Sequence, residues 1–162
     1  MDTLSMRGRL YSGRNNVRLL TTVDGEPCAH FRLREFENRE GLAMVHESAL
    51  DALERVRRDL CAMAGEDVWI IVTDAVRTQA DLDRLAARLG WADQGGQVAR
   101  DSKHLAKHGG IAVDIIAVNA RDRTRVPQAT LGAVCRRHFD FVKDDYRDGH
   151  VHADTRDRAR QG

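Results

Sequence analysis

Two histidines and one aspartate stand in segments of this chain that favour β-structure. His104 follows Ser102, Asp114 lies in the run Ala-Val-Asp-Ile, and His152 lies near the C-terminus. Two imidazoles and one carboxylate make up the three-ligand set of a catalytic Zn²⁺ that keeps its fourth position open for water. The sequence therefore predicts a zinc site formed by His104, Asp114 and His152, and metal-assisted hydrolysis as its chemistry.

Hydrolysis of this kind also needs a base that takes a proton from water, and two residues are candidates. His150 lies two residues before His152, so that in a strand both side chains point to the same side. Asp148 lies four residues before His152, but a turn at Gly149 would break this alternation. We favour His150 over Asp148 as the base.

One alternative metal ligand remains open. His108 lies six residues before Asp114 and could replace His104. The Ser-x-His context of His104 favours His104 as the ligand. For His108 outside that role, and for His30 and His46, we expect surface positions, as we do for His138.

The elements that must hold these residues follow from hydrophobic periodicity. Apolar residues at helical spacing and capping residues predict helices over Ser48–Met63, with Ser48 as N-cap and Asp51 in the first turn, between Thr78 and Gly90, and from Pro127 onward. Apolar and β-branched runs predict strands at Val17–Val23, Val68–Thr73, Ile111–Val118, Phe139–Val142 and His150–Ala153. This order predicts an α+β fold. We expect a small, mainly antiparallel sheet with helices packed on one side and the metal on the open face.

Composition limits the other possibilities. A length of 162 residues predicts a single domain. The formal net charge of +1 gives no indication of nucleic-acid binding, and no apolar run is long enough to span a membrane. The N-terminus lacks the apolar core of a signal peptide, so we expect synthesis in the cytoplasm without one. Three cysteines without CxxC spacing indicate free thiols rather than a disulfide framework.

The order of motifs resembles a known family. From about residue 31 to residue 158 the chain is similar to the M15-type zinc D-Ala-D-Ala carboxypeptidases and peptidoglycan endopeptidases, whose metal site is shared with hedgehog-like domains. Four elements carry the resemblance. Phe31–Phe36 resembles the family's entry segment, and Val68–Arg77 resembles its "ITSAYR" strand and turn. Ser102–Leu105 with Ala112–Ile115 resembles "SxHxxGxAxDI", and Gly149–Thr155 resembles "FVHxDTG". The resemblance implies a hedgehog/DD-peptidase-like fold.

The chain departs from the family pattern in three places. Ten positions separate His104 from Asp114, more than is usual, so that Ala106–Gly109 must form a longer turn. Val76 replaces the tyrosine that usually precedes the arginine, and Gly149 replaces the carboxylate expected three residues before the last ligand. The resemblance still implies that Arg77 reaches the substrate, because a guanidinium suits a carboxylate or a developing oxyanion. The competing interpretation of Arg77 is a structural ion pair.

The resemblance implies a zinc metallopeptidase that hydrolyses peptide bonds in peptidoglycan stem peptides, as a carboxypeptidase or an endopeptidase. Without a signal peptide, a phage-type lytic enzyme that is released by another factor or carried by a virion is the expected setting. Two alternatives belong to other classes. One is a non-catalytic structural or cell-wall-binding domain of a phage particle. The other is a hedgehog-like domain with a purely structural zinc and a fourth protein ligand, His150 or His108.

Overall fold

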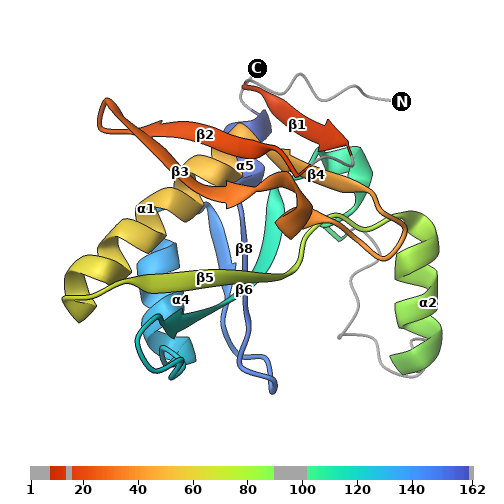
Figure 1. Ribbon diagram of the computed structural model, residues 1–162. Coiled ribbons are helices and arrows are strands. Elements are labelled where there is room, and N and C mark those ends of the chain that lie inside the picture. The colour runs from red at the N-terminus through yellow and green to blue at the C-terminus, as the bar shows by residue number, and fades with distance from the viewer. Residues whose placement is uncertain (1–7, 14–15, 90–101, 161–162) are drawn as a thin grey trace.

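A four-stranded antiparallel sheet forms the centre of the molecule (Figure 1). The computed structural model describes residues 8–13, 16–89 and 102–160. The sheet has the strand order β5-β6-β8-β7 and consists of β5 (Val68–Asp74), β6 (Ala112–Asn119), β8 (Val151–Asp154) and β7 (Phe141–Lys143) (Figure 1). The predicted α+β class with a small antiparallel sheet is therefore confirmed. Four of the five predicted strands correspond to these four, with ends shifted by two residues at most.

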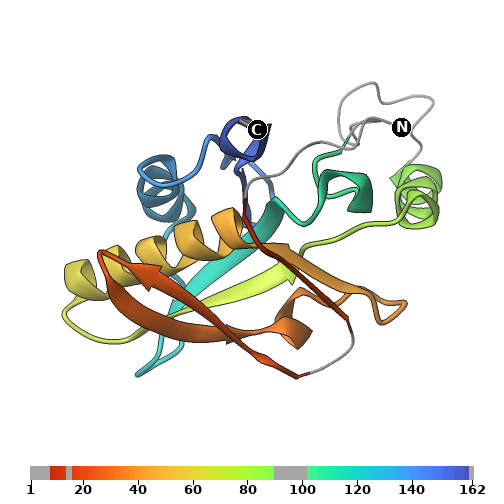
Figure 2. The same cartoon turned by 90° about the horizontal axis from the view of Figure 1, so that it is seen from above.

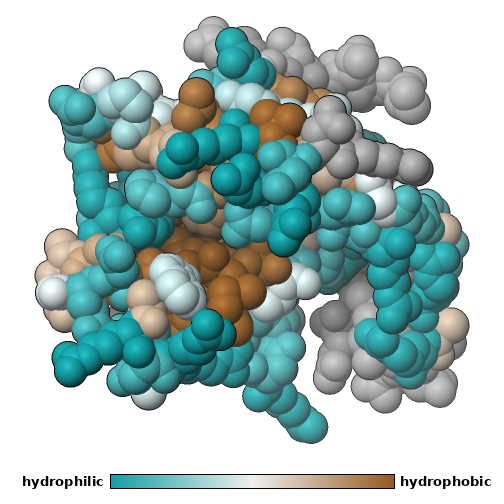
Figure 3. All heavy atoms as spheres, viewed as in Figure 1, coloured by the Kyte–Doolittle hydropathy of each residue, from teal (hydrophilic) through white to brown (hydrophobic). Residues whose placement is uncertain are grey.

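The two faces of this sheet differ. The side chains of Val68 and Ile70 on β5 are buried, whereas those of Trp69 and Ile71, which alternate with them, are 43% and 41% exposed. β6 is buried along almost its whole length, as expected for a central strand. In the space-filling view apolar surface gathers where β5 crosses β6 (Figure 3). The sheet is thus covered on one face and more open on the other.

Helices cover the buried face. Helix α1 (Glu47–Ala64) packs against β5 and against α4 (Gln128–Arg136), and α4 packs against β7 and β8. The buried side of α1 repeats at helical spacing and consists of Ala49, Leu50, Ala52, Leu53, Glu54, Val56 and Leu60. The same hydrophobic core includes Val113, Ile115, Val151 and Ala153 of the sheet. These packed strands hold the register of the residues on the open face.

The start of α1 corrects one prediction. The N-cap is His46 rather than Ser48, and the imidazole of His46 accepts a hydrogen bond from the backbone N–H of Ser48. β4 (Ala43–His46) leads directly into the helix, which therefore begins at Glu47. The Ser48 hydroxyl instead contacts that of Thr155 at 2.7 Å. A histidine in the capping position is outside the usual set of N-cap residues, so the sequence favoured the wrong residue.

The N-terminal part adds two strand pairs that cover the other side of α1. β1 (Leu10–Gly13) pairs with β4, and β2 (Arg18–Val23) pairs with β3 (Glu26–Arg32), followed by the 3₁₀ turn η1 (Leu33–Phe36). Only β2 was predicted. Leu19 and Phe31 join the hydrophobic core, so the N-terminal strands share one core with α1 and the central sheet.

Three further elements complete the described part of the chain. α2 (Gln79–Leu89) stands at the edge of the molecule, away from α1 (Figures 1 and 2). η2 (Ala106–His108) forms the longer turn expected between His104 and Asp114, and α5 (Arg156–Arg160) follows β8. The loop predicted at residues 91–101 lies outside the described residues. Among the described helices, none has the length and apolar character needed to cross a bilayer.

Candidate metal centre

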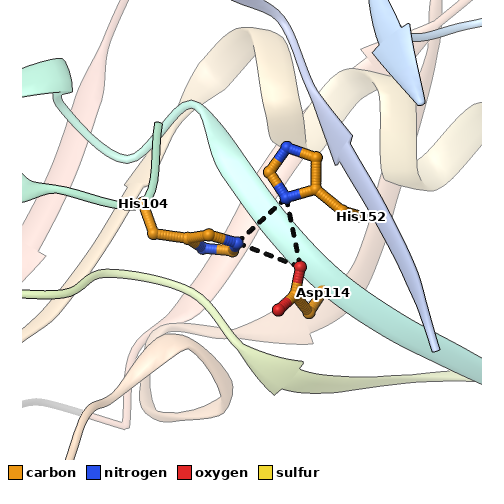
Figure 4. A group of neighbouring side chains, drawn as sticks. All are labelled: His104, Asp114 and His152. Carbon is orange, nitrogen blue, oxygen red and sulfur yellow. Dashed lines mark hydrogen bonds and ion pairs between the residues drawn. The ribbon is translucent and has the colours of Figure 1, made fainter. Parts of the chain in front are cut away.

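The structure brings His104, Asp114 and His152 together. Asp114 on β6 lies directly opposite His152 on β8, and His104 comes from the segment that precedes η2 (Figure 4). Asp114 Oδ1 lies 2.9 Å from His104 Nε2 and 3.2 Å from His152 Nδ1, and the two nitrogens are 3.0 Å apart. All three side chains are buried. This buried group could hold a metal ion.

His104 is held from behind by the end of β5. Its Nδ1 donates to the backbone carbonyl of Ala75 at 2.5 Å, which leaves Nε2 facing Asp114. The backbone N–H of Arg77 donates to the carbonyl of His104 at 2.7 Å, and the backbone N–H of His104 donates to Ser102 Oγ at 3.2 Å. The Ser-x-His motif therefore shapes the turn that carries His104.

His152 is held in a similar way by a carboxylate. Its Nε2 donates to Asp154 Oδ2 at 2.8 Å, and Arg156 Nη2 donates to the same oxygen at 2.7 Å. Asp154 is fully buried. A histidine whose far nitrogen is bound to a carboxylate is a common arrangement in metal sites, because it fixes the tautomer and raises the basicity of the ligand nitrogen.

These outer hydrogen bonds determine what the inner atoms offer. Since Ala75 and Asp154 accept the protons of the outer nitrogens, neutral His104 and His152 turn lone pairs toward Asp114 Oδ1. Three lone-pair atoms at 2.9–3.2 Å repel one another unless a proton or a metal ion lies among them. Ligands about 2.0–2.1 Å from a tetrahedral metal ion are about 3.3 Å apart, slightly more than the 2.9–3.2 Å found here, so a small shift of the side chains would accommodate such an ion.

The electrostatics of the group favour a cation. Burial raises the pKa of Asp114, but His104 and His152 outweigh it and hold that pKa well below its usual range. Burial lowers the pKa of His152, whereas hydrogen bonds to Asp114 and Asp154 raise it, and the net change is an increase. Burial also opposes ionisation of Asp154, yet Arg156 and His152 lower its pKa to about 2. Both carboxylates are anionic at neutral pH.

The second oxygen of Asp114 faces two further predicted site residues. Asp114 Oδ2 lies 3.5 Å from Arg77 Nη2 and 3.5 Å from His150 Nε2. Arg77 also donates from Nε and Nη2 to Asp74 Oδ2, at 2.8 and 2.6 Å. Arg77 is thus at the centre and in an ion pair at the same time. The contact with Asp74 agrees with the interpretation of Arg77 as part of a structural ion pair. The position of Arg77 beside Asp114 agrees with the interpretation that it binds the substrate.

His150 and Asp148 form a pair beside the centre. Asp148 accepts hydrogen bonds from the backbone N–H of His150 at 3.1 Å and from its ring Nδ1. The first of these bonds, together with the ring of His150, lowers the pKa of Asp148. Gly149 adopts φ +83° and makes the turn between them, so that His150 precedes β8 but still reaches Asp114.

The sequence did not predict two neighbours of the site, and two histidines lie in positions other than those expected. The ring of Tyr146 stacks on His150 with centroids 4.0 Å apart, and burial raises the pKa of Tyr146 to about 12. Nothing in the sequence marked Tyr146 or Asp74. Among the histidines expected at the surface, His46 and His108 are buried, so that expectation is wrong for both. His108 does not belong to the metal-binding group, which contains His104.

No protein-family model matches the chain, and no curated protein matches it. The function must be argued from the site.

Proposed function

We propose that this protein is a zinc-dependent peptidase that acts on the stem peptides of peptidoglycan, as a carboxypeptidase or an endopeptidase. One observation carries the metal-dependent part of this proposal. Three buried ligand atoms of His104, Asp114 and His152 converge within 3.2 Å, while the outer nitrogens of both histidines are bound elsewhere. Two imidazoles and one carboxylate are a donor set of catalytic zinc sites.

The three residues would hold the ion. When bound, Zn²⁺ supplies Lewis acidity and lowers the pKa of a water toward about 7. Asp154 and the carbonyl of Ala75 keep the two imidazoles oriented throughout.

The neighbouring residues supply proton transfer and charge. His150 turns Nε2 toward the centre because Nδ1 is bound to Asp148. A neutral His150 can accept a proton from the attacking water and pass it to the leaving amine, while Asp148 orients the ring. Arg77 presents a guanidinium beside Asp114, where it can stabilise negative charge on the peptide oxygen or bind a carboxylate.

The choice of peptidoglycan rests on the resemblance of the four motif elements to the M15-type enzymes and is an analogy. It implies action at the cell wall, by a phage-type lytic enzyme that is released or carried by a virion. The motifs that match most closely, around His104, Asp114 and His152, are those that the structure gathers into one site.

The test has two parts. Protein purified without a metal-binding tag should contain about one zinc per chain by elemental analysis. The zinc-loaded protein should then release D-alanine or muropeptides from purified sacculi, and the His104→Ala variant should not. Protein that takes up no transition metal after addition of Zn²⁺ would rule out the proposal. Bound zinc without release from several peptidoglycan types would favour the non-catalytic domain or the structural zinc.

A further inference from the structure

A pocket lies next to the metal centre on the side of α2. It has a cavity volume of about 400 Å³ and is bordered by η1 and the turn after it, by the end of β5 and by α2. The space-filling view is hollowed between α2 and the body of the molecule (Figure 3). The metal ligands themselves do not line this pocket.

Arg77 connects the pocket with the centre. Its side chain lines the pocket and also lies 3.5 Å from Asp114 Oδ2. Asp74, which holds the guanidinium of Arg77, lines the pocket as well. A peptide that places one bond at the metal centre can therefore extend past Arg77 into the pocket.

Some of the charged side chains that line the pocket are bound in ion pairs, and others are not. Four guanidinium groups, of Arg39, Arg77, Arg84 and Arg88, face three carboxylates of Glu35, Glu37 and Asp74, which leaves one net positive charge. Arg77 is bound to Asp74, and Arg84 to Glu40 at 3.0 Å. The guanidinium groups of Arg39 and Arg88 form no hydrogen bond or ion pair within the described ranges, and both side chains are exposed to solvent.

We propose that this pocket binds one carboxylate of the peptide substrate through Arg39 and Arg88. The inference rests on the proposed function, because the scissile bond is taken to lie at the metal centre. A guanidinium matches a carboxylate with two parallel hydrogen bonds. The single net positive charge suits one carboxylate better than a polyanion. The carboxylate has two sources in a peptide, an acidic side chain and the C-terminus.

Binding of matched peptides to the zinc-loaded protein tests the proposal without relying on turnover. Calorimetry would compare a short acetylated peptide that contains glutamate with its glutamine counterpart, both with amidated C-termini. A second pair would compare the glutamine peptide with a free C-terminus and with an amide. We expect the acid to bind at least about tenfold more tightly than the amide in one pair, since a charged hydrogen bond contributes this much. The pair that discriminates identifies the source of the carboxylate.

Variants assign the effect to the pocket. Arg39→Gln and Arg88→Gln should each reduce the discrimination between acid and amide, and the double variant should abolish it. Arg58→Gln is the control, because Arg58 is also an exposed arginine but lies on α1, where it pairs with Asp24. Three results would overturn the proposal that the pocket binds a carboxylate. They are equal binding of acid and amide in both pairs, absence of binding, and discrimination that survives the double variant. Discrimination without hydrolysis of any peptide would instead count against the proposed function alone.

Discussion

Asp114 and His152 form a cross-strand pair of β6 and β8, with Asp114 Oδ1 3.2 Å from His152 Nδ1. Their neighbours Val113 and Ala153 form the next pair and are completely buried on the helix-covered face. Because side chains alternate along a strand, a shift of one residue would turn the ligands into the core. The packing of the core therefore fixes the register on which two of the three metal ligands depend.

The identity of the third ligand can be tested by two alanine variants. His104→Ala removes Nε2 from the centre, so we expect loss of the bound metal. His108→Ala should keep the metal, because His108 lies outside the group. Elemental analysis of both purified variants measures the difference. Retention by His104→Ala together with loss by His108→Ala would move the site.

Asp154→Asn tests the residue behind His152. The amide keeps the shape of the side chain but removes the charge that accepts the proton of Nε2 and pairs with Arg156. Metal affinity should fall by about 10–100-fold, the usual range for such orienting carboxylates. Competition with a chromogenic chelator gives the dissociation constant. Asp140→Asn is a suitable control, since Asp140 pairs with Arg158 instead. Equal losses in both variants would indicate a general effect on stability.

Arg77→Ala should separate substrate chemistry from folding. The backbone hydrogen bonds of residue 77 to the His104 segment survive the substitution, so the metal should be retained. The ion pair with Asp74 is partly exposed and should contribute only about 0–1 kcal/mol to the free energy of unfolding. Turnover should fall by about 100-fold. Thermal denaturation, zinc content and peptide release measure the three quantities. A collapse of stability with loss of metal would identify Arg77 as a structural residue.

His150→Ala and Asp148→Asn test the proposed proton transfer. A general base contributes about 10²–10⁴-fold to the rate, so His150→Ala should lower turnover strongly while the metal stays bound. Asp148→Asn should have a smaller effect, because Asp148 only orients the ring of His150. Rates of peptide release at equal zinc content provide the comparison. Full activity in His150→Ala and none in Asp148→Asn would make Asp148 the base.

The stabilisation by metal should increase with pH. The pKa of His152 is raised in the metal-free protein, so the stability that its proton contributes is present below the unfolded pKa of about 6.5 and is lost as the pH rises through the folded pKa. Metal binding displaces this proton and is therefore favoured by high pH. The carboxylates of Asp114 and Asp154, with lowered pKa values, stay ionised throughout the window from about pH 5.5 to about pH 8.

Thermal denaturation with and without Zn²⁺ measures this effect. The difference between the two midpoints should grow from about pH 5.5 to about pH 8, and a chelator should abolish it. A difference that is constant over this window would mean that no histidine proton is displaced by the metal.

The strong elements were predictable because their patterns are local. Val68–Thr73 and Ile111–Val118 are apolar runs, and a run of this kind needs no partner to be recognised. The N-terminal strands β1 and β4 have four residues each, and β3 mixes polar and apolar residues without a regular pattern, so all three depend on pairing with a partner strand. Phe31 and Val45 on these strands are buried, and the sequence around each of them does not indicate this burial.

The residues of the site also fall into those that the sequence indicates and those that only the fold selects. Spacing and residue type marked His104, Asp114 and His152, because metal ligands belong to a small set of side chains. The carbonyl of Ala75 was not predictable, since every residue has one and only the fold selects it. Tyr146 reaches His150 through a turn held by Gln128, whose side-chain amide donates to the carbonyls of both residues. Such a contact depends on α4 and appears only in three dimensions.

The different origins of the three ligands have a kinetic consequence. Asp114 and His152 lie on paired strands, and the pairing fixes their separation. His104 belongs to a segment tied to the end of β5 by the hydrogen bonds that join Arg77 with His104 and Ala106. Asp114 and His152 would therefore be the two preformed ligands of an ion, and His104 would be the ligand whose position depends on these backbone bonds. The lifetime of the bound ion would then be governed by how often those few backbone bonds open, and not by the strength of the sheet.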